Sequence, residues 1–505
     1  MINSYIKISK SVNFSDISVN EYRLSAKSYR LIHIANNNVE AISSLLIANP
    51  ISGNEVGSLA YVSKSDFYFL RTKAIQDDNF TLDFESNGAL QPIKPFHFSK
   101  TNKTKKGIKY GDILFVTGGN VGAVIFVDKD YQNFIFSSHI LKLNFTKNTF
   151  YIYAFLKHNI AKEQANFAPE GSIKGLDTFK LNFLLDIKIP FPNYNTENTI
   201  QFIELLTQAI IHKEQLIKQR HESILQTIET ELLNNQKPNQ FKFELPTINE
   251  IENTGRLDTN LYREDFKKIV FQIENYTKCF QSIQDLGFTL SRGQNLQVSN
   301  IGDSVYSKKK YKNFYTLMLP KFLSKYGTVD KVEYLGNPNS LKTLQKGDLI
   351  FGAEGFEKGR SVVIIEEQDR VITNIHGITI QQEEHNVVKA IFVKCCLDYL
   401  RSKGLIDLYA VGGNGGSLAQ KYWDIIPFPK FEESKQEEIA MLYHNPVSVY
   451  QADAFTLDNF LEQDNAFNET AGIYELDKTA KQLKEILNKA IDNIANDREV
   501  EIYFK

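Results

Sequence analysis

Two runs of lysine have the residue types and spacing to bind phosphate groups. Aromatic side chains interleave the second run, and lysine contacts to phosphates supply salt-dependent affinity and fix a protein's register on a duplex. For either run alone a solvated surface loop is the favoured interpretation, whereas two runs in corresponding places make phosphate binding equally favoured. The first run is Lys100, Lys103, Lys105, Lys106 and Lys109; the second is Lys308, Lys309, Lys310 and Lys312, with Tyr306, Tyr311, Phe314 and Tyr315 between and around them.

Two glycine-rich loops, Gly118–Gly122 and Gly355–Arg360, each follow an apolar run. A dinucleotide-binding loop would need G-x-G-x-x-G spacing and a helix directly after it. Here the spacing differs and another strand-like run, AVIFV or SVVII, comes next, so we predict hairpin turns. Lys358 and Arg360, at the tip of the second loop, are candidates for DNA contact, as is Arg292, because arginine can bind guanine with two hydrogen bonds.

A second pair of glycine-rich loops spans 171–175 and 412–417. Glycine permits both close backbone approach to a ligand and an ordinary tight turn, so both interpretations stay open. Lys174 lies in the first of these loops and is a further candidate for DNA contact.

The sequence offers little for catalysis or metal binding. His139 and His376 lie in apolar runs without ligand partners at metal spacing, so we expect core histidines, and Trp423 a core residue too. The three cysteines have no C-x-x-C spacing, which argues against a zinc site or a disulfide framework. There is no Asn/Asp-Pro-Pro-Tyr/Phe motif of amino-methyltransferases and no G-x-x-x-x-G-K-[ST] loop of ATPases.

These candidates belong to a repeat inside the chain. YGDILFVTGGNVG at 110–122 resembles KGDLIFGAEGFEKG at 346–359, and further matches follow in the same order at offsets that drift by only four residues. One such match is common by chance, whereas a collinear series indicates two copies of one domain. The matched landmarks are Arg23–Tyr29 with Arg256–Tyr262, Gly111-Asp112 with Gly347-Asp348, Gly122 with Gly359, His139 with His376, and Ile189–Pro192 with Ile426–Pro429.

Each copy is predicted to be mostly strand with one helix. Short β-branched and aromatic runs such as ILFV, FIFSSHILKL and VITNIHGITI are separated by turn residues. A helix is expected near YIYAFLKHNI in copy 1 and near AIFVKCCLDYLRSK in copy 2, before the Pro-Phe-Pro motif that ends each copy.

A long amphipathic helix is predicted after copy 1. Residues 197–235 contain no glycine or proline, and isoleucine recurs every seven residues, which is typical of a coiled coil. At 1.5 Å per residue the helix would span about 57 Å. A second such helix is expected near the C-terminus. The apolar positions are Ile203, Leu206, Ile210, Ile217 and Ile224 in the first helix, interrupted by Lys213 and Arg220, and Leu476, Leu483, Leu487 and Ile494 in the second.

The expected fold class is α+β, with two similar mixed α/β domains separated by two long antiparallel coiled-coil helices. The expected boundaries are copy 1 at 1–196, the first long helix at 197–235, a polar linker at 236–253, copy 2 at 254–430, and a broken helical region with the second long helix at 431–497.

Composition fits this organisation. The chain has 505 residues, 42% of them hydrophobic and 23% charged, which is near the average for globular proteins and enough for more than one core. The net charge of −2 is unusual for a stand-alone nucleic-acid binder, which leaves binding to local basic patches. Without a signal peptide or an apolar run of about 18 residues, we expect a cytoplasmic protein.

In the order and duplication of these landmarks, the chain resembles a specificity subunit of type I restriction–modification systems, over nearly its whole length. The resemblance implies a non-catalytic chain in which each repeat, a target-recognition domain, reads one half of a split DNA site while the helices set the gap. It also implies two adenine-methyltransferase subunits as partners, joined by restriction subunits. S-adenosylmethionine, ATP and Mg would be used by those partners, and this chain would carry no cofactor or metal.

The sequence departs from a regular pattern at one place and leaves alternatives open. After Asn445-Pro446, about 25 irregular residues precede the second long helix, and this insertion is a candidate partner-docking surface. The alternatives are the recognition subunit of a type IIB-like restriction–methylation enzyme, a duplicated enzyme with an unfamiliar active site, and a structural adaptor whose domains bind protein.

Overall fold

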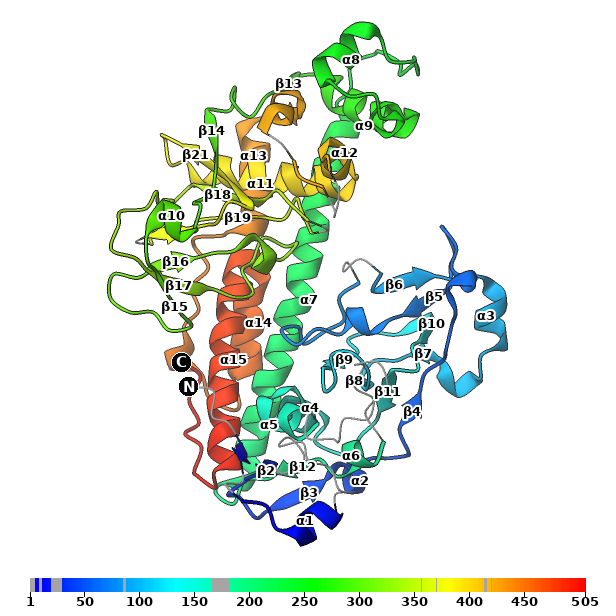
Figure 1. Ribbon diagram of the computed structural model, residues 1–505, viewed down its shortest axis with the longest axis vertical. Helices are drawn as coiled ribbons and strands as arrows, with labels where there is room; N and C mark the ends of the chain where they lie inside the picture. Colours follow the sequence, from blue (N-terminus) through cyan, green and yellow to red (C-terminus); the bar gives the residue numbers. More distant parts are fainter. Residues whose placement is uncertain are drawn as a thin grey trace. The chain divides into compact units, whose positions relative to one another are not determined.

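The computed structural model describes residues 5–8, 11–19, 30–84, 88–165, 181–355, 357–368, 370–412, 416–418 and 420–505. They form two compact units (Figure 1). Unit 1 comprises residues 1–216, 449–469 and 476–505, and unit 2 comprises residues 217–448 and 470–475. Most of the C-terminal segment therefore joins copy 1. The Arg23–Tyr29 motif, the 171–175 loop and Lys174 lie outside the described residues.

Unit 1 contains two four-stranded sheets, ordered β4-β11-β8-β9 and β6-β5-β10-β7, and the two-stranded pairs β1-β2 and β12-β3. Short β-branched and aromatic runs form these strands, as the sequence predicts. The strands are β1 (Ile6–Ile8), β2 (Arg30–Ile32), β3 (Val39–Ala41), β4 (Ile51–Ser52), β5 (Tyr68–Leu70), β6 (Leu90–Pro92), β7 (Lys106–Ile108), β8 (Ile113–Val116), β9 (Val124–Phe126), β10 (Tyr131–Phe136), β11 (Ile140–Leu143) and β12 (Lys188–Pro190).

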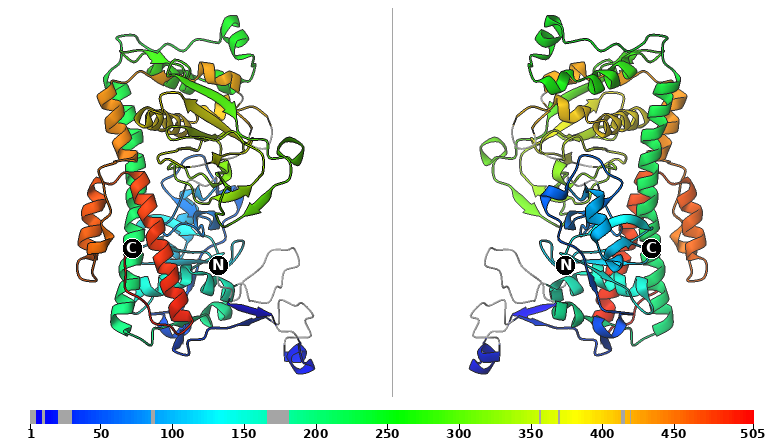
Figure 2. Two further views of the ribbon diagram at one scale, coloured as in Figure 1. Left: turned by 90° about the vertical axis from the view of Figure 1, so that its left-hand side faces the viewer. Right: turned by 90° about the vertical axis from the view of Figure 1, so that its right-hand side faces the viewer.

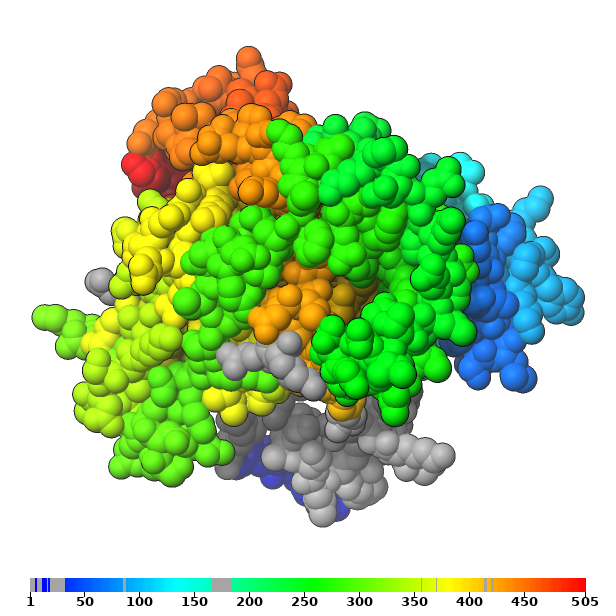
Figure 3. All heavy atoms as spheres, turned by 90° about the horizontal axis from the view of Figure 1, so that it is seen from above, coloured from blue at the N-terminus to red at the C-terminus, as the bar shows by residue number. Residues whose placement is uncertain are grey.

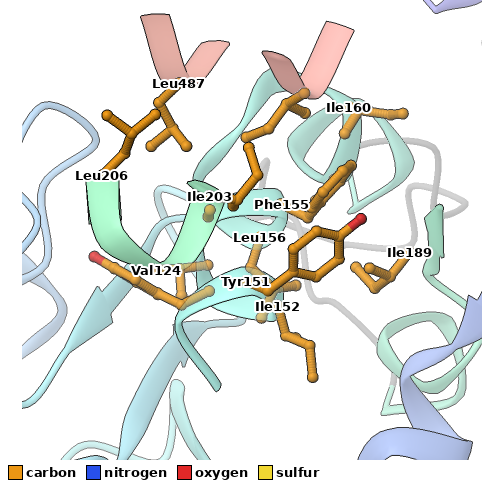
Figure 4. Packing of buried hydrophobic residues seen from close by; sticks show 14 of the residues in the cluster. Val124, Tyr151, Ile152, Phe155, Leu156, Ile160, Ile189, Ile203, Leu206 and Leu487 are labelled. Atoms are coloured by element: carbon orange, nitrogen blue, oxygen red, sulfur yellow. The ribbon is translucent and has the colours of Figure 1, made fainter. Parts of the chain in front are cut away.

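The helices of unit 1 bury the main core of copy 1. Tyr151 and Phe155 on α4 pack with Ile203 and Leu206 on α7 and with Leu487 on α15 (Figure 4). The helices are α1 (Phe14–Val19), α2 (Ile42–Leu45), α3 (Pro95–Lys100), α4 (Thr149–Lys157), α5 (Asn159–Ala165), α6 (Leu181–Leu185), the first part of α7 (Thr196–Asn234), most of α14 (Phe460–Thr470) and most of α15 (Ile473–Ala495).

Unit 2 contains two four-stranded sheets, ordered β14-β21-β18-β19 and β15-β17-β16-β20, and the pair β13-β22. Its strands are β13 (Phe280–Gln281), β14 (Phe288–Arg292), β15 (Val305–Ser307), β16 (Tyr315–Leu317), β17 (Glu333–Gly336), β18 (Leu349–Gly352), β19 (Ser361–Val363), β20 (Val371–Ile372), β21 (Gly377–Gln382) and β22 (Phe428–Pro429). Besides the second part of α7, its helices are α8 (Ile248–Thr254), α9 (Glu264–Glu274), α10 (Val298–Ile301), α11 (Val387–Ser402), α12 (Leu405–Tyr409) and α13 (Glu433–Tyr443).

The two units share the order of one four-stranded sheet and two further strand pairs, which confirms the duplication. The order β4-β11-β8-β9 recurs as β14-β21-β18-β19, the parallel pair β5-β10 as β16-β20, and the antiparallel pair β3-β12 as β13-β22. The register also repeats: Ser52 lies opposite Leu141 in copy 1, and Arg292 lies opposite Ile378 in copy 2. Ser52 therefore takes the place of Arg292.

The recurring Gly-Asp motif is explained by a tight turn before β8 and β18. The first residues of Gly111-Asp112 and Gly347-Asp348 have φ angles of 88° and 85°, a region that favours glycine. Each aspartate then accepts a hydrogen bond of 2.8 Å from a backbone N–H three residues before it, that of Lys109 or Gln345. The motif is therefore structural in both copies.

A second pair of glycines, Gly53 and Gly293, permits close backbone contact with a turn that both copies share. A Cβ atom would lie 2.2 Å from the carbonyl oxygen of Phe136 at Gly53, and 2.1 Å from that of Asn374 at Gly293. In each copy this approach aligns the end of β4 or β14 with the turn that precedes β11 or β21.

Helix α7 has 39 residues and begins and ends within one residue of the predicted bounds. In unit 1 its first part packs against α15, and Figure 2 shows α15 in red beside α7 in green. Glu214 of α7 pairs with Lys484 of α15 at 2.9 Å, and Phe202 packs on Phe504 beyond the end of α15, so the two helices run antiparallel within this unit. The predicted apolar positions are all buried: Ile203, Leu206, Ile210, Ile217, Ile224, Leu476, Leu483, Leu487 and Ile494.

The insertion at 447–470 is more ordered than the sequence indicates, because it contains helix α14. This helix neutralises Lys213, which the heptad pattern treats as an interruption. The fully buried Nζ of Lys213 lies 2.7 Å from Asp464 and 2.6 Å from the amide oxygen of Asn468, with the rings of Tyr450 and Phe467 about 5 Å away. Burial lowers the pKa of Lys213, and the carboxylate of Asp464 partly offsets that effect. The insertion thus covers α7 within unit 1.

The segment 236–253, predicted to be a linker, contains most of α8. Thr247 caps this helix, since its hydroxyl accepts a bond from the N–H of Glu250 while Glu250 accepts one from the N–H of Thr247. The capping box follows the expected pattern for a helix start. Figure 3 shows α8 and α9, in green, on the surface of unit 2.

We expect Asp464→Ala to lower the free energy of unfolding by about 3–5 kcal/mol, because it leaves the Lys213 ammonium buried without its counter-charge. Urea unfolding followed by circular dichroism measures this loss. The paired change Lys213→Met with Asp464→Leu removes both charges and should restore most of the stability. A decrease of less than about 1 kcal/mol in Asp464→Ala would show that the pair is not coupled.

We expect Gly293→Ala to lower the free energy of unfolding by about 1–3 kcal/mol, because its methyl group overlaps the backbone of Asn374. Gly57→Ala is the matched control, since nothing lies within 4 Å of a Cβ atom there. Equal stabilities of the two variants, measured by thermal unfolding, would contradict the close approach.

Candidate nucleic-acid interface

Three loops and a strand end meet at one place in unit 2, which we call the copy 2 corner and define as Arg292, Glu354, His376 and Ser417. Arg292 ends β14, Glu354 follows β18, and His376 precedes β21. Ser417 lies in the glycine-rich loop at 412–417. Glu354 and Ser417 form a β-bridge, which brings the two glycine-rich loops together.

The copy 2 corner is a network of charged side chains. The guanidinium of Arg292 donates from Nη1 to Glu354 Oε1 at 3.1 Å and to the carbonyl of Ile375 at 3.2 Å, and from Nη2 to the hydroxyl of Ser417 at 3.4 Å. The second carboxylate oxygen of Glu354 lies 2.6 Å from Nδ1 of His376. The side chains of Arg292 and His376 are 36% and 59% exposed, so the network is open to solvent.

The matching place in copy 1, the copy 1 corner, consists of Ser52, Gly118 and His139. The Ser52 hydroxyl donates to the carbonyl of Ser138 at 3.3 Å. The ring of His139 lies so close to Gly118 that a Cβ atom there would be 2.5 Å from Nδ1. The two corners share a backbone, yet the described residues of the copy 1 corner include no arginine and no carboxylate.

The two histidines are not core residues, which corrects the expectation from the sequence. FIFSSHILKL and VITNIHGITI each form two strands instead of one, and the turn between the strands carries His139 or His376. Each carbonyl accepts a backbone bond from the glycine-rich loop, from Thr117 at 2.8 Å or from Ala353 at 3.1 Å. Both side chains are exposed at the surface. Trp423, by contrast, is fully buried against Phe351, as expected.

The lysine run of copy 2 lies on the loop between β15 and β16. Lys308, Lys309, Lys310 and Lys312 are all exposed, and among the described residues none of them takes part in an ion pair. Tyr306 on β15 and Tyr311 on the loop are 55% and 54% exposed. This loop offers positive charge and aromatic surface together.

The two lysine runs do not lie in corresponding places, which corrects the expectation from the sequence: the run of copy 1 follows β5, whereas the run of copy 2 precedes β16, the counterpart of β5. The run of copy 1 is also partly used by the fold. Lys105 donates to the carbonyl of Gly53 at 3.1 Å, and Lys106 donates to that of Ser99 at 3.0 Å. Lys100 lies over the ring of Phe96. Lys103 and Lys109 are exposed.

Lys358 and Arg360 do not extend from a loop tip, because both turn inward. Lys358 is buried and pairs with Asp407 at 2.6 Å. Arg360 pairs with Glu357 and donates to the carbonyl of Leu323 at 3.1 Å. The loops themselves are hairpin turns, as predicted, because β8 pairs with β9 and β18 with β19.

A shallow hollow of about 110 Å³ lies beside Arg292. Its lining is mostly polar and includes Gln294, Asn295, Lys342 and Gln381. Lys342 donates to the hydroxyl of Ser291 at 3.0 Å, which places its ammonium next to the end of β14. The hollow extends the polar surface of the copy 2 corner.

Sequence reasoning missed Glu354 and Ser417 and misassigned His376. The signal that could have helped is the correspondence between Ser52-Gly53 in copy 1 and Arg292-Gly293 in copy 2. The glycines of both dipeptides make the same close backbone contact. Aligning these dipeptides would have shown that the counterpart of Arg292 is a serine, although the contact with the glycine-rich loops arises only in the tertiary fold.

The described residues contain no group of three histidine, cysteine or acidic side chains that could hold a metal ion. Cys395 and Cys396 are buried in α11, and burial raises the pKa of Cys395 to about 12, which leaves its thiol protonated and unreactive at neutral pH. No helix in the described part of the chain has the length and hydrophobicity to cross a bilayer.

No protein-family model matches the sequence, and no curated protein matches it. Among solved structures, the chain is similar to a type I restriction–modification S subunit from M. genitalium, with 15% identity, a TM-score of 0.34, and coverage of 90% of this chain and 97% of that one. It is also similar to the HsdS subunit from Thermoanaerobacter tengcongensis, with 11% identity, a TM-score of 0.27, and coverage of 91% and 96%. These proteins are of the kind that the sequence resembles, although at such TM-scores the similarity by itself assigns no function.

Proposed function

We propose that this chain is the DNA-recognition subunit of a restriction–modification complex. Each copy would bind one half of a bipartite, asymmetric duplex site, and the long helices would fix the gap between the halves. The chain would itself be non-catalytic.

One observation supports this proposal above the others: the two copies share a backbone but differ in the side chains at their corners. Two domains that have the same backbone but different polar side chains are suited to two different half-sites. Base edges are distinguished by the hydrogen-bond donors and acceptors that face them. An adaptor that binds one kind of protein surface would not need an arginine–glutamate–histidine network in one copy and serine, glycine and histidine in the other.

The long helix supports the idea of a fixed gap. At 1.5 Å per residue, 39 residues span about 58 Å, and α7 belongs to unit 1 in its first part and to unit 2 in its second. In dimeric DNA-binding proteins the distance between two reading elements determines the spacing of the half-sites. Here α7 of a single chain would determine the spacing of the two half-sites.

The proposed partners follow from this role. Two methyltransferase subunits would dock on the chain and modify adenine with S-adenosylmethionine, and restriction subunits that use ATP and Mg would complete the nuclease. This chain would contribute recognition and hold no cofactor.

The exposed lysines of the β15–β16 loop provide the first test. Changing Lys308, Lys309, Lys310 and Lys312 to alanine should weaken binding to every duplex. The slope of log affinity against log salt should flatten by about 0.9 for each phosphate that these lysines neutralise in the wild type. Fluorescence anisotropy with labelled duplexes at several salt concentrations measures both effects.

The control changes four other exposed lysines of unit 2 to alanine, namely Lys242, Lys268, Lys278 and Lys430, and so alters net charge equally. If both variants show the same decrease in affinity and slope, the loop has no specific role. If wild-type binding is weak and independent of salt, the adaptor interpretation replaces the proposal.

The helix provides the second test. Deleting one heptad, residues 217–223, removes about 10 Å of α7, and we expect the preferred gap to shorten by about three base pairs. Binding to a series of duplexes with different gaps measures the optimum, while near-UV circular dichroism reports whether the units remain folded.

A variant that repeats residues 217–223 is the converse, and its preferred gap should lengthen by the same amount. Should a folded variant of either kind keep the wild-type optimum, α7 does not set the gap.

A further inference from the structure

The side chain of Arg292 is anchored on one edge only. Nη1 donates hydrogen bonds to Glu354 and to the carbonyl of Ile375. Nη2 donates one long hydrogen bond, to the hydroxyl of Ser417. Among the described residues, Nε of Arg292 has no hydrogen-bond partner. Two neighbouring N–H groups, one on Nε and one on Nη2, therefore remain available.

This free edge has the geometry of a base-reading group. A guanidinium is planar and presents two parallel N–H donors, which match the N7 and O6 acceptors of guanine in the major groove. A side chain that is already held in place loses less conformational entropy on binding than a free one. Glu354 and the carbonyl of Ile375 supply that restraint for Arg292.

Glu354 is itself held from a second side. Its other oxygen contacts Nδ1 of His376 at 2.6 Å, and its backbone bridges to Ser417. The carboxylate therefore cannot turn away without breaking a second contact. Glu354 acts as a positioning residue, which orients Arg292 without needing to touch DNA.

A purely structural role for the network conflicts with copy 1. The same turn and the same close glycine contact form in copy 1, where Ser52 replaces Arg292 and Gly118 replaces Glu354. The fold of this corner thus needs neither the arginine nor the carboxylate. Their presence in copy 2 alone calls for a function that copy 1 does not share.

We infer that Arg292, oriented by Glu354, reads a guanine in the half-site bound by copy 2. This inference rests on the proposed function and adds a specificity-determining residue to it. The polar hollow with Gln294, Asn295 and Lys342 adjoins Arg292 on the same surface and would lie against the neighbouring base pairs or phosphates. The copy 1 corner, without an arginine, would specify its own half-site by other contacts.

The test selects duplexes from a library with two randomised half-sites, using the full chain alone and together with co-expressed methyltransferase subunits. The wild type should enrich one bipartite motif. Arg292→Ser, which installs the residue of copy 1 on the same backbone, should lose a guanine preference at one position of one half-site, by roughly 10- to 100-fold. The other half-site, the gap and the salt slope should stay as in the wild type.

The matched control is Arg263→Ser, another exposed arginine of unit 2 that pairs with a nearby carboxylate, Asp265, at 2.6 Å. It should keep the guanine preference. Glu354→Ala should weaken the preference at the same base pair as Arg292→Ser, and the double variant should be no worse than Arg292→Ser, as expected if Glu354 acts through Arg292.

Each further outcome has one meaning. An unchanged motif in Arg292→Ser overturns the inference and leaves the proposed function intact, whereas a wild type that enriches no bipartite motif overturns the proposed function. If Arg292→Ser unfolds or loses all binding, Arg292→Met decides. This variant keeps an unbranched side chain but has no hydrogen-bond donor, so a retained guanine preference would refute base reading by the guanidinium.

Discussion

Burial of one long apolar stripe is the constraint on which both units depend. Helix α7 contains no glycine or proline, and its isoleucines recur every seven residues, so an isolated α7 would expose a continuous apolar face. The chain buries that face along the whole helix: Ile203 and Ile210 pack against α15 in unit 1, and Ile217 and Ile224 are buried in unit 2. The main core of unit 1 includes residues of this helix, and in unit 2 Ile228 and Leu232 of the same helix are buried as well.

Buried polar side chains then fix how α7 lies in each unit. In unit 1, Lys213 points to Asp464 of α14, and in unit 2, His221 lies 3.4 Å from Asp398 of α11, which also pairs with Lys394 at 2.7 Å. Apolar packing alone tolerates rotation and sliding of a helix, whereas a buried charge must meet its partner. The heptad interruption at Lys213 is therefore not a weakness of the pattern. It selects one register for the helix and gives the insertion at 447–470 its place.

Local rules predicted much of the fold and less of the surface chemistry. The repeat, the hairpins of the glycine-rich loops, the helices α4 and α11 and the bounds of α7 follow from periodicity and turn residues, which depend on neighbours in sequence. The corners do not, because they join segments such as Arg292, Glu354 and Ser417 that only the tertiary fold brings together. His139 and His376 were misassigned for a related reason: an apolar stretch was taken as one strand, although a turn divides it and exposes the histidine. Lys358 and Arg360 turn inward, to Asp407 and to the carbonyl of Leu323, and these distant partners are not revealed by a local pattern.

Comparing the two copies distinguishes the residues that the fold of the domain requires from those that its function requires. Features that both copies share, such as the Gly-Asp turns and the close contacts of Gly53 and Gly293, have structural explanations in bond geometry and steric space. At the two corners, Arg292, Glu354 and His376 are on the surface in copy 2, on the frame that carries Ser52, Gly118 and His139 in copy 1. A serine at the place of Arg292 leaves the strand register unchanged, so the chemistry of the corner can change without refolding the domain. One backbone can therefore present different donors and acceptors in its two copies, which is the physical requirement for recognising an asymmetric site with a duplicated domain.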